Sequence, residues 1–380
     1  MIKFTVNTAE LKKALAITSL AVGKITNHIQ SHALFTVQGD QCLVNSSDED
    51  KVAESFFILT EIEGGDIQFT ADPKSLQKLL NSSDSAETKL SYEPETMTLK
   101  VYASDNKRSY LSFASMDPEK FLSPDLSAQE LKHTVTKEIF LDGIKFVQGF
   151  LLEKDEKFSN IYISNGVFYG ANGNTRVGAF TSPDMEESPD LILRKSVLTP
   201  IANMVEKADI TEIAIKTSDK LITFYSPDGL HCFGFRKSIA VTPKFPISTK
   251  APDLPKFNVN RALFLKKLNR LSLTSWEDIG IKMSIKEETL EMETVGERPS
   301  FETIPCKYDS KEPIDFVIQC NKFKEVLSLF KASNVDIYIA KNKCTIYSSA
   351  NIEIDEENKE TPVTKPFVAA GLMTLARLVK

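Results

Sequence analysis

The chain has 380 residues, of which 42% are apolar and 26% charged, a composition typical of globular proteins with two or three domains. No secretory leader follows Met1 and no run approaches the ~18 apolar residues of a membrane helix, so we expect a cytoplasmic protein without membrane segments. The five cysteines form no CxxC pair, which argues against a disulfide framework and a thiolate metal site. A net charge of −6 argues, taken alone, against a polyanionic partner.

The first element predicted is a strand at residues 3–7, and its pattern returns at 132–136 and 256–260. The three starts lie 129 and 124 residues apart (132 − 3 and 256 − 132), which is the size of a domain. Each strand leads into an apolar stripe with helical spacing. The stripes are Leu11, Ala14, Leu15 and Thr18; Phe140, Gly143, Ile144 and Val147; and Phe264, Lys267, Leu268 and Leu271.

A second helix is predicted about sixty to seventy residues into each repeat. Its apolar positions are Leu76, Leu79 and Leu80; Val197, Ile201 and Met204; and Phe323, Val326, Leu327 and Phe330. Asp72 and Pro73 read as the N-cap and first residue of the first of these helices. Pro200 removes a hydrogen bond from a helix interior, so we expect the middle one to begin late, at Thr199.

Alternating apolar segments with turn residues fill the space between and after the helices, and Asn165-Gly166 is the strongest hairpin signal. Each repeat therefore reads as strand, helix, several strands, helix, several strands, an α+β unit with two helices on one face of antiparallel sheets. Prolines gather near residues 118–124 and 243–255. We expect three domains, at residues 1–128, 129–254 and 255–380.

The helices carry positive charge although the whole chain is acidic. The windows 10–20, 72–80, 137–148, 193–207, 260–271 and 320–331 together carry +10, which leaves −16 for the remaining residues. Helices on one side of a sheet would thus present a positive surface opposite an acidic strand surface. Lysine is also a strong helix former, and this ordinary explanation of the charge remains open.

The three repeats, with "KFTV" at the amino terminus and "ARL" near the carboxyl terminus, resemble the bacterial DNA polymerase sliding clamp, the β subunit, over essentially the whole chain. The resemblance implies a homodimeric, head-to-tail ring that encircles duplex DNA without reading its sequence. It implies no catalytic residue, no cofactor and no metal. DNA polymerase and clamp-loader subunits would bind the ring through short linear peptides.

The resemblance assigns residues to three surfaces. The DNA-facing cations would be Lys12, Lys13, Lys24, Lys74, Lys195, Lys266, Arg270, Lys324 and Lys331. The dimer interface would place Leu111 and Phe113 against Leu271 and Leu273 of the partner. The peptide-binding pocket would comprise Val147, Gly173, Asn174, Arg176, Val177, Pro246, Lys250, Met373, Leu375, Arg377 and Leu378.

The sequence also bears on two other classes of function. An enzyme finds no support, because "AVGKIT" lacks the first glycine of a phosphate-binding loop, His28 and His32 have no acidic residue between them as in HExxH, and no serine lies in GxSxG. The acidic run at residues 46–54 lacks the spacing of an EF-hand. A peptide-binding scaffold of the same fold that does not encircle DNA remains the alternative.

Overall fold

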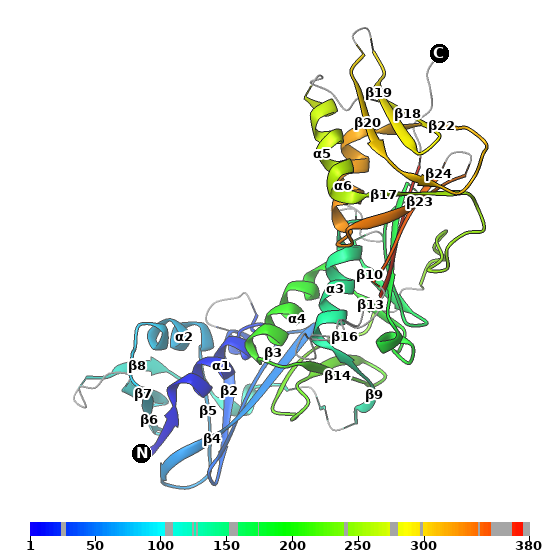
Figure 1. Ribbon diagram of the computed structural model, residues 1–380. Coiled ribbons are helices and arrows are strands. Elements are labelled where there is room, and N and C mark those ends of the chain that lie inside the picture. The colour runs from blue at the N-terminus through cyan, green and yellow to red at the C-terminus, as the bar shows by residue number, and fades with distance from the viewer. Residues whose placement is uncertain are drawn as a thin grey trace, which may run out of the picture. The chain divides into compact units, whose positions relative to one another are not determined.

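The computed structural model describes residues 1–23, 28–102, 109–123, 125–126, 128–151, 159–173, 175–238, 242–273, 280–296, 299–340, 343–350 and 367–374 (Figure 1). Within these residues the order strand, helix, strands, helix, strands occurs three times. The fold is α+β, as the sequence predicts.

The three series have the following bounds. The first consists of β1 (Ile2–Asn7), α1 (Thr8–Thr18), η1 (Ile29–Ser31), β2 (Ala33–Gln38), β3 (Gln41–Ser47), β4 (Lys51–Glu63), β5 (Ile67–Ala71), α2 (Pro73–Asn81), β6 (Glu87–Glu93), β7 (Thr98–Tyr102), β8 (Leu111–Ala114) and η2 (Pro118–Lys120). The second consists of β9 (Glu130–Thr136), α3 (Lys137–Gln148), β10 (Ile161–Ser164), β11 (Val167–Asn172), β12 (Arg176–Thr181), η3 (Pro183–Met185), β13 (Leu191–Leu193), α4 (Lys195–Lys207), β14 (Glu212–Thr217), β15 (Leu221–Tyr225) and β16 (His231–Arg236). The third consists of β17 (Lys256–Asn260), α5 (Arg261–Ser272), β18 (Gly280–Lys286), β19 (Thr289–Thr294), β20 (Phe301–Pro305), β21 (Lys307–Tyr308), β22 (Ile314–Gln319), α6 (Cys320–Leu329), β23 (Asn334–Ala340), β24 (Lys343–Ala350) and β25 (Phe367–Thr374).

The sheets join neighbouring series. A 12-stranded sheet runs β8-β7-β6-β1-β4-β16-β15-β14-β9, with β2, β3 and β5 branching from β4, so that β4 of the first series pairs with β16 of the second. A 9-stranded sheet runs β13-β10-β11-β12-β25-β24-β23-β17-β21, so that β12 of the second pairs with β25 of the third. The remaining four strands form the sheet β20-β19-β18-β22. All pairings are antiparallel.

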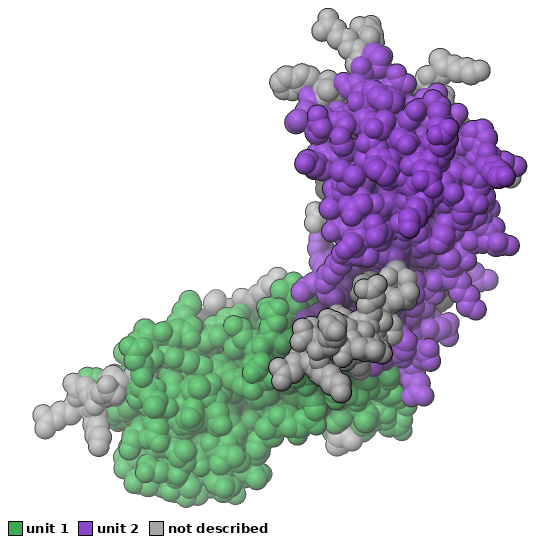
Figure 2. Space-filling model, in the orientation of Figure 1, with its two compact units in different colours: residues 1–137, 196–239 green, residues 138–195, 240–380 purple. Residues whose placement is uncertain are grey.

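The chain forms two compact units (Figure 2). Unit 1 comprises residues 1–137 and 196–239, and unit 2 comprises residues 138–195 and 240–380. The middle series is thus divided between the units, because its strands extend the sheet of one neighbour or the other. The three domain boundaries remain predictions.

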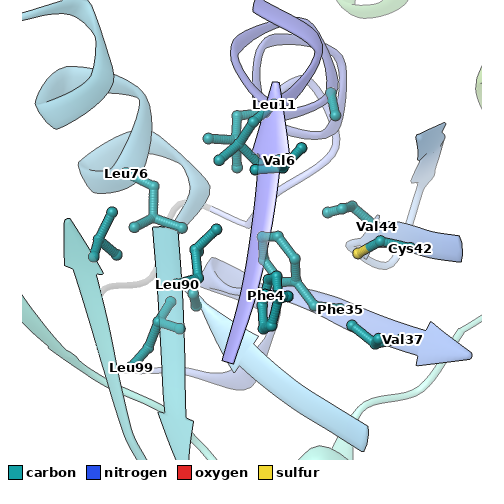
Figure 3. Packing of buried hydrophobic residues seen from close by; sticks show 14 of the residues in the cluster. Phe4, Val6, Leu11, Phe35, Val37, Cys42, Val44, Leu76, Leu90 and Leu99 are labelled. Carbon is teal, nitrogen blue, oxygen red and sulfur yellow. The ribbon is translucent and has the colours of Figure 1, made fainter. Parts of the chain in front are cut away.

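The core of unit 1 confirms the predicted apolar stripes of its first two helices. Leu11, Ala14 and Leu15 of α1 and Leu76 and Leu80 of α2 are buried in one cluster with β-strand residues such as Phe4 and Phe35 (Figure 3). The Phe35 and Phe69 rings stack with centroids 4.8 Å apart. Both helices therefore pack on the same apolar face of the sheet, at spacing i, i+3, i+4.

Two stripe positions that look weak in the sequence have local explanations in the structure. A Cβ on Gly143 of α3 would lie 2.8 Å from the Phe168 ring, so the helix needs glycine to approach β11 this closely. Lys267 of α5 is half-buried and forms an ion pair with Glu302. The helical register therefore holds at both positions.

The helix starts agree with the capping signals, with one exception. Asp72 accepts a hydrogen bond from the Lys74 amide at 3.0 Å, and Pro73 is the first residue of α2, as predicted. The prediction that the middle helix begins at Thr199 is wrong, because α4 begins at Lys195 and contains Pro200. Pro200 has no amide hydrogen to donate to the carbonyl four residues earlier, that of Ser196, but Ser196 is exposed, so water can hydrate this carbonyl.

The Asn165-Gly166 hairpin is confirmed. Ser164 of β10 pairs with Val167 of β11, and the two turn residues have φ of 50° and 73°. Both values lie in the left-handed region that a two-residue type I′ turn requires. A Cβ on Gly166 would also lie 2.5 Å from the Met185 carbonyl oxygen, so only glycine fits there.

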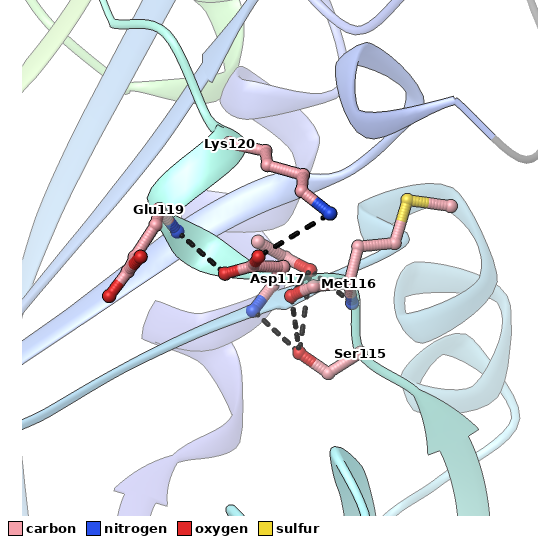
Figure 4. Close-up of polar contacts among 6 residues, drawn as sticks. Ser115, Met116, Asp117, Glu119 and Lys120 are labelled. Atoms are coloured by element: carbon pink, nitrogen blue, oxygen red, sulfur yellow. Dashed lines mark hydrogen bonds and ion pairs between the residues drawn. The ribbon is translucent and has the colours of Figure 1, made fainter.

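The connection that follows β8 is pinned to β5 at its start (Figure 4). The Thr70 amide donates to Ser115 Oγ at 2.9 Å, and the Met116 amide donates to Thr70 Oγ1 at 2.7 Å. Asp117 caps η2 by accepting from the Glu119 amide at 3.1 Å. Further along, Ser47 Oγ donates to the Leu122 carbonyl at 2.7 Å, which holds the connection against β3.

A row of polar side chains crosses the sheet of unit 1. Asn45 of β3 pairs with Glu54 of β4, which pairs with Cys232 of β16, which pairs with Tyr225 of β15. Asn45 Nδ2 donates to Glu54 Oε1 at 2.5 Å and to Ser123 Oγ at 2.6 Å. Burial raises the pKa of the Glu54 carboxyl, partly offset by the Asn45 hydrogen bond.

Glu54→Gln is expected to stabilise unit 1 at pH 8. A carboxyl whose pKa is raised by folding does not destabilise the protein below its unfolded-state pKa. The protein loses stability as the pH rises from that value through the folded-state pKa of the carboxyl. The variant should therefore gain unfolding free energy at pH 8 and nearly none at pH 4, as measured by urea denaturation at the two pH values. Glu49→Gln, at an exposed position in the nearby turn, is the control. An equal gain at both pH values would contradict the assigned cause.

Candidate nucleic-acid, interface and peptide surfaces

The predicted DNA-facing cations of unit 1 lie on α1 and α2. Lys12 is half-buried, and its Nζ donates to the Ser83 carbonyl at 3.2 Å. Lys13 is also half-buried. Burial lowers the pKa of the His231 imidazole, and the charge of Lys13 lowers it further. For the Asp228 carboxyl, burial acts to raise the pKa, but the hydrogen bond from Ser226, with a small contribution from Lys13, lowers it. Lys74 is exposed. Lys24 lies outside the described residues.

The predicted cations on α5, on α6 and just after α6 are mostly held by neighbouring groups. Arg270 Nε lies 3.0 Å from Glu302 Oε1, and Lys331 Nζ lies 2.7 Å from Asp142 Oδ1. Lys324 Nζ donates to Ser272 Oγ at 3.0 Å. Lys266 is exposed on α5. Hydrogen bonding from Lys267, with the charge of Arg270, lowers the pKa of the Glu302 carboxyl, so this acid is ionised at neutral pH.

Lys195 is the first residue of α4 and is exposed.

The acids that pair with the predicted cations could not be found from the sequence. Asp142 and Lys331 are 189 residues apart, and Glu302 lies on a strand 35 residues from Lys267. No local sequence pattern reports pairs at such separations.

The predicted interface residues fall on an edge strand and on the end of a helix. β8 pairs only with β7 among the described strands and thus is an edge of the 12-stranded sheet. Leu111 is 53% exposed, whereas Phe113 packs partly on the core of unit 1. Leu273, just after α5, is 85% exposed. Leu271 is only 2% exposed and belongs to the core of unit 2, so its side chain offers no surface to a partner.

A groove runs along the exposed side of α5. Its volume is about 580 Å³, and it is lined by Arg261, Ala262, Leu265, Lys266, Asn269, Arg270 and Leu273. Phe301, on the edge strand β20, is 59% exposed. The sequence analysis did not identify Phe301 as an exposed residue of an edge strand. An aromatic residue beside a charged one in an alternating segment was a signal that could have indicated this.

The predicted peptide-pocket residues lie on both faces of the 9-stranded sheet of unit 2. Arg176 of β12 pairs with Met373 of β25, and Arg176 Nη1 lies 2.6 Å from Glu325 Oε2 of α6, so these residues face the helices. Val147 of α3 is fully buried on that same side, where its carbonyl lies against Gly170. Gly173 has φ of +58° in the turn that joins β11 and β12.

The opposite face of this sheet carries Val177, which is fully buried beneath the connection that leads to β17. Val177 and Ala171 pack against Phe245 and Ile247 of this connection. Pro246 and Lys250 of the same connection are exposed. Asn174, Leu375, Arg377 and Leu378 lie outside the described residues.

Neither a metal centre nor a membrane span is found in the part of the chain that the structure describes. No three His, Cys, Asp or Glu side chains in these residues are placed to hold a metal ion. No helix in them is long and apolar enough to cross a membrane.

Solved structures of sliding clamps match the chain over its whole length. The β sliding clamp of Caulobacter crescentus superposes with a TM-score of 0.76 at 15% identity, covering 99% of both chains. The DNA polymerase III subunit β of Pseudomonas aeruginosa gives 0.75 at 14%, covering 99% of this chain and all of the other. That of Thermotoga maritima gives 0.73 at 14%, with complete coverage of both. No protein-family model and no curated protein sequence matches the chain. Across its full length, therefore, the chain has the fold of the DNA polymerase III β-subunit sliding clamps.

Proposed function

We propose that the protein is a DNA sliding clamp, a ring that encircles duplex DNA and tethers the replicative polymerase and other DNA-processing proteins. The observation that carries the proposal is the full-length match to sliding clamps, in which all three strand-helix series take part. A tether of this kind works by effective concentration, since a partner held on DNA rebinds before it diffuses away.

Cations on the helices support a sequence-independent contact with DNA. Duplex DNA carries one negative charge per ~1.7 Å, so lysines such as Lys74 and Lys266 would be attracted to phosphates without reading bases. The acids that hold Arg270 and Lys331 reduce this attraction. Weak, diffuse attraction suits a protein that must slide.

Closure of the ring by a second copy is supported by two exposed surfaces, one in each compact unit. Edge strand β8 with Leu111 would meet the α5 groove, Leu273 and edge strand β20 of the partner in a head-to-tail arrangement. Two unpaired edges satisfy each other's backbone groups and remove an aggregation hazard. Homodimerisation by this route leaves the exposed cations of α2 and α4, Lys74 and Lys195, available to line the ring.

The peptide-binding surface around Val177, Pro246 and Lys250 is proposed as the docking place of polymerase and clamp-loader peptides. We also propose that the protein is cytoplasmic, catalyses no reaction and needs no cofactor. Its domains are proposed at residues 1–128, 129–254 and 255–380.

A peptide-binding scaffold of the same fold that does not encircle DNA is the second candidate. It is favoured by the ion pairs of Arg270 with Glu302 and of Lys331 with Asp142, which leave fewer cations for phosphates. Topology separates the two candidates, because a closed ring leaves DNA only over a free end.

The test loads the protein on nicked circular DNA, with a clamp loader or by reversible opening at low concentration, and then isolates the DNA by gel filtration in 0.5 M salt. A sliding clamp stays with the circle and is lost when a restriction enzyme linearises it. A scaffold is lost from both forms at this salt concentration, since screening removes simple electrostatic binding.

A further inference from the structure

The connection between β16 and β17 crosses the face of the 9-stranded sheet opposite the helices. We call residues 242–251 of this connection the strap. Exposure alternates along it: Lys244, Pro246, Ser248 and Lys250 are exposed, whereas Phe245, Ile247 and Thr249 are half-buried. A period of two is that of an extended chain with every second side chain turned to the sheet.

Two side chains of the strap fill the apolar surface beneath it. Phe245 stacks on Tyr169 with centroids 4.7 Å apart and ring planes 8° apart. Ile247 packs against Ala171 and Val177 on one side and against Tyr338, Tyr347 and Ala370 on the other. Ile247 therefore sits where strands of the second and third series meet.

The strap is held by few interactions other than these. The Tyr347 hydroxyl lies 2.7 Å from the Ser248 carbonyl oxygen and 3.0 Å from that of Lys250, and donates its one proton to them. Among the described residues, no backbone hydrogen bond joins the strap to the sheet. A segment held by side chains alone opens locally at a low free-energy cost compared with a paired strand.

We propose that the strap is an internal plug of the peptide-binding surface, and that a partner peptide binds by replacing Ile247 with an aliphatic side chain of its own. This inference rests on the proposed peptide-tethering function. The strap indicates the chemistry of its competitor: an extended segment with an aromatic residue, any residue and then an aliphatic one. The apparent affinity for a partner peptide equals the intrinsic affinity multiplied by the fraction of molecules in which the strap is open, so a mostly closed strap weakens binding.

Variants that loosen the strap while leaving the sheet intact test the proposal. Phe245→Ala and Ile247→Ala each remove one inward side chain, and Lys244→Ala changes an outward one as a matched control. The probe is a fluorescent, amide-capped heptapeptide that copies residues 244–250, KFPISTK. Affinity is measured by fluorescence anisotropy, and hydrogen exchange of residues 242–251 reports opening. Circular dichroism identifies any variant that fails to fold, in which case the other variant decides.

Both strap variants are expected to bind the probe about tenfold more tightly than the wild type and Lys244→Ala, with faster exchange in the strap. Equal affinity in all four proteins, or no binding to either folded strap variant, would overturn the proposal. Failure here is distinguishable from failure of the clamp function, since the DNA retention assay does not involve the probe. Binding of the probe without retention on circular DNA would support the proposal that the strap is a plug and would favour the scaffold over the sliding clamp.

Discussion

Leu111→Asp is expected to convert a dimeric protein into monomers at micromolar concentration. Leu111 is 53% exposed on edge strand β8, so the substitution is tolerated in the isolated chain. In the proposed interface the carboxylate would be buried without a partner, which costs on the order of 3–5 kcal/mol and weakens dimerisation more than 100-fold. Light scattering coupled to gel filtration measures the mass of each protein.

Leu131→Asp is the matched control for this experiment. Leu131 is 59% exposed on β9, the strand at the other end of the same sheet, and lies outside the proposed interface. The control should remain dimeric. Dissociation of both variants to the same extent, or a wild type that is already monomeric, would contradict the assignment of β8 to the ring closure.

Gly170→Ala is expected to destabilise unit 2 by about 3 kcal/mol, near the upper end of the usual cost of overpacking. A Cβ on Gly170 would lie 2.2 Å from the Val147 carbonyl oxygen, which belongs to the backbone and cannot rotate away. Helix α3 would have to move from β11, and the packing of Phe168 and Phe180 against Gly143 would be lost with it. Guanidinium denaturation followed by circular dichroism measures the unfolding free energy.

Gly296→Ala provides the control in the same unit. Among the described residues, no atom other than those of its chain neighbours lies within 4 Å of a Cβ added to Gly296, so the change should alter the unfolding free energy by less than about 0.5 kcal/mol. Similar denaturation midpoints for the two alanine variants would show that α3 and β11 are not packed as tightly as described.

The threefold organisation could be predicted because the burial of side chains leaves a direct trace in the sequence. Leu11, Phe140 and Phe264 recur at the same place in each series, and all three are buried. The turn at Asn165-Gly166 and the start of α2 were also predictable, since both depend on local backbone chemistry. The late start of the middle helix was a local inference too, and it was wrong because tertiary packing of Val197 and Leu198 outweighs one lost hydrogen bond.

Long-range pairing could not be predicted in the same way. Nothing near β4 indicates that its partner is β16, and nothing near Val177 indicates that Phe245 and Ile247 cover it. Leu271, by contrast, belongs to the apolar stripe predicted from the sequence and is buried as that stripe requires, whereas Leu273, two residues later, is exposed. The pairing of β4 and the covering of Val177 depend on where the chain returns after tens of residues, which local periodicity does not report.

A covalently closed ring tests the central claim most directly. The native cysteines Cys42, Cys232, Cys306, Cys320 and Cys344 are all buried, so a bismaleimide should join only cysteines introduced by Leu111→Cys and Leu273→Cys. The protein is loaded on closed circular DNA, crosslinked, and washed in denaturant. We predict that doubly crosslinked dimers stay linked to the circle through the wash and are released when the DNA is linearised. Crosslinked dimers that leave intact circles in denaturant would contradict the claim that the protein encircles DNA.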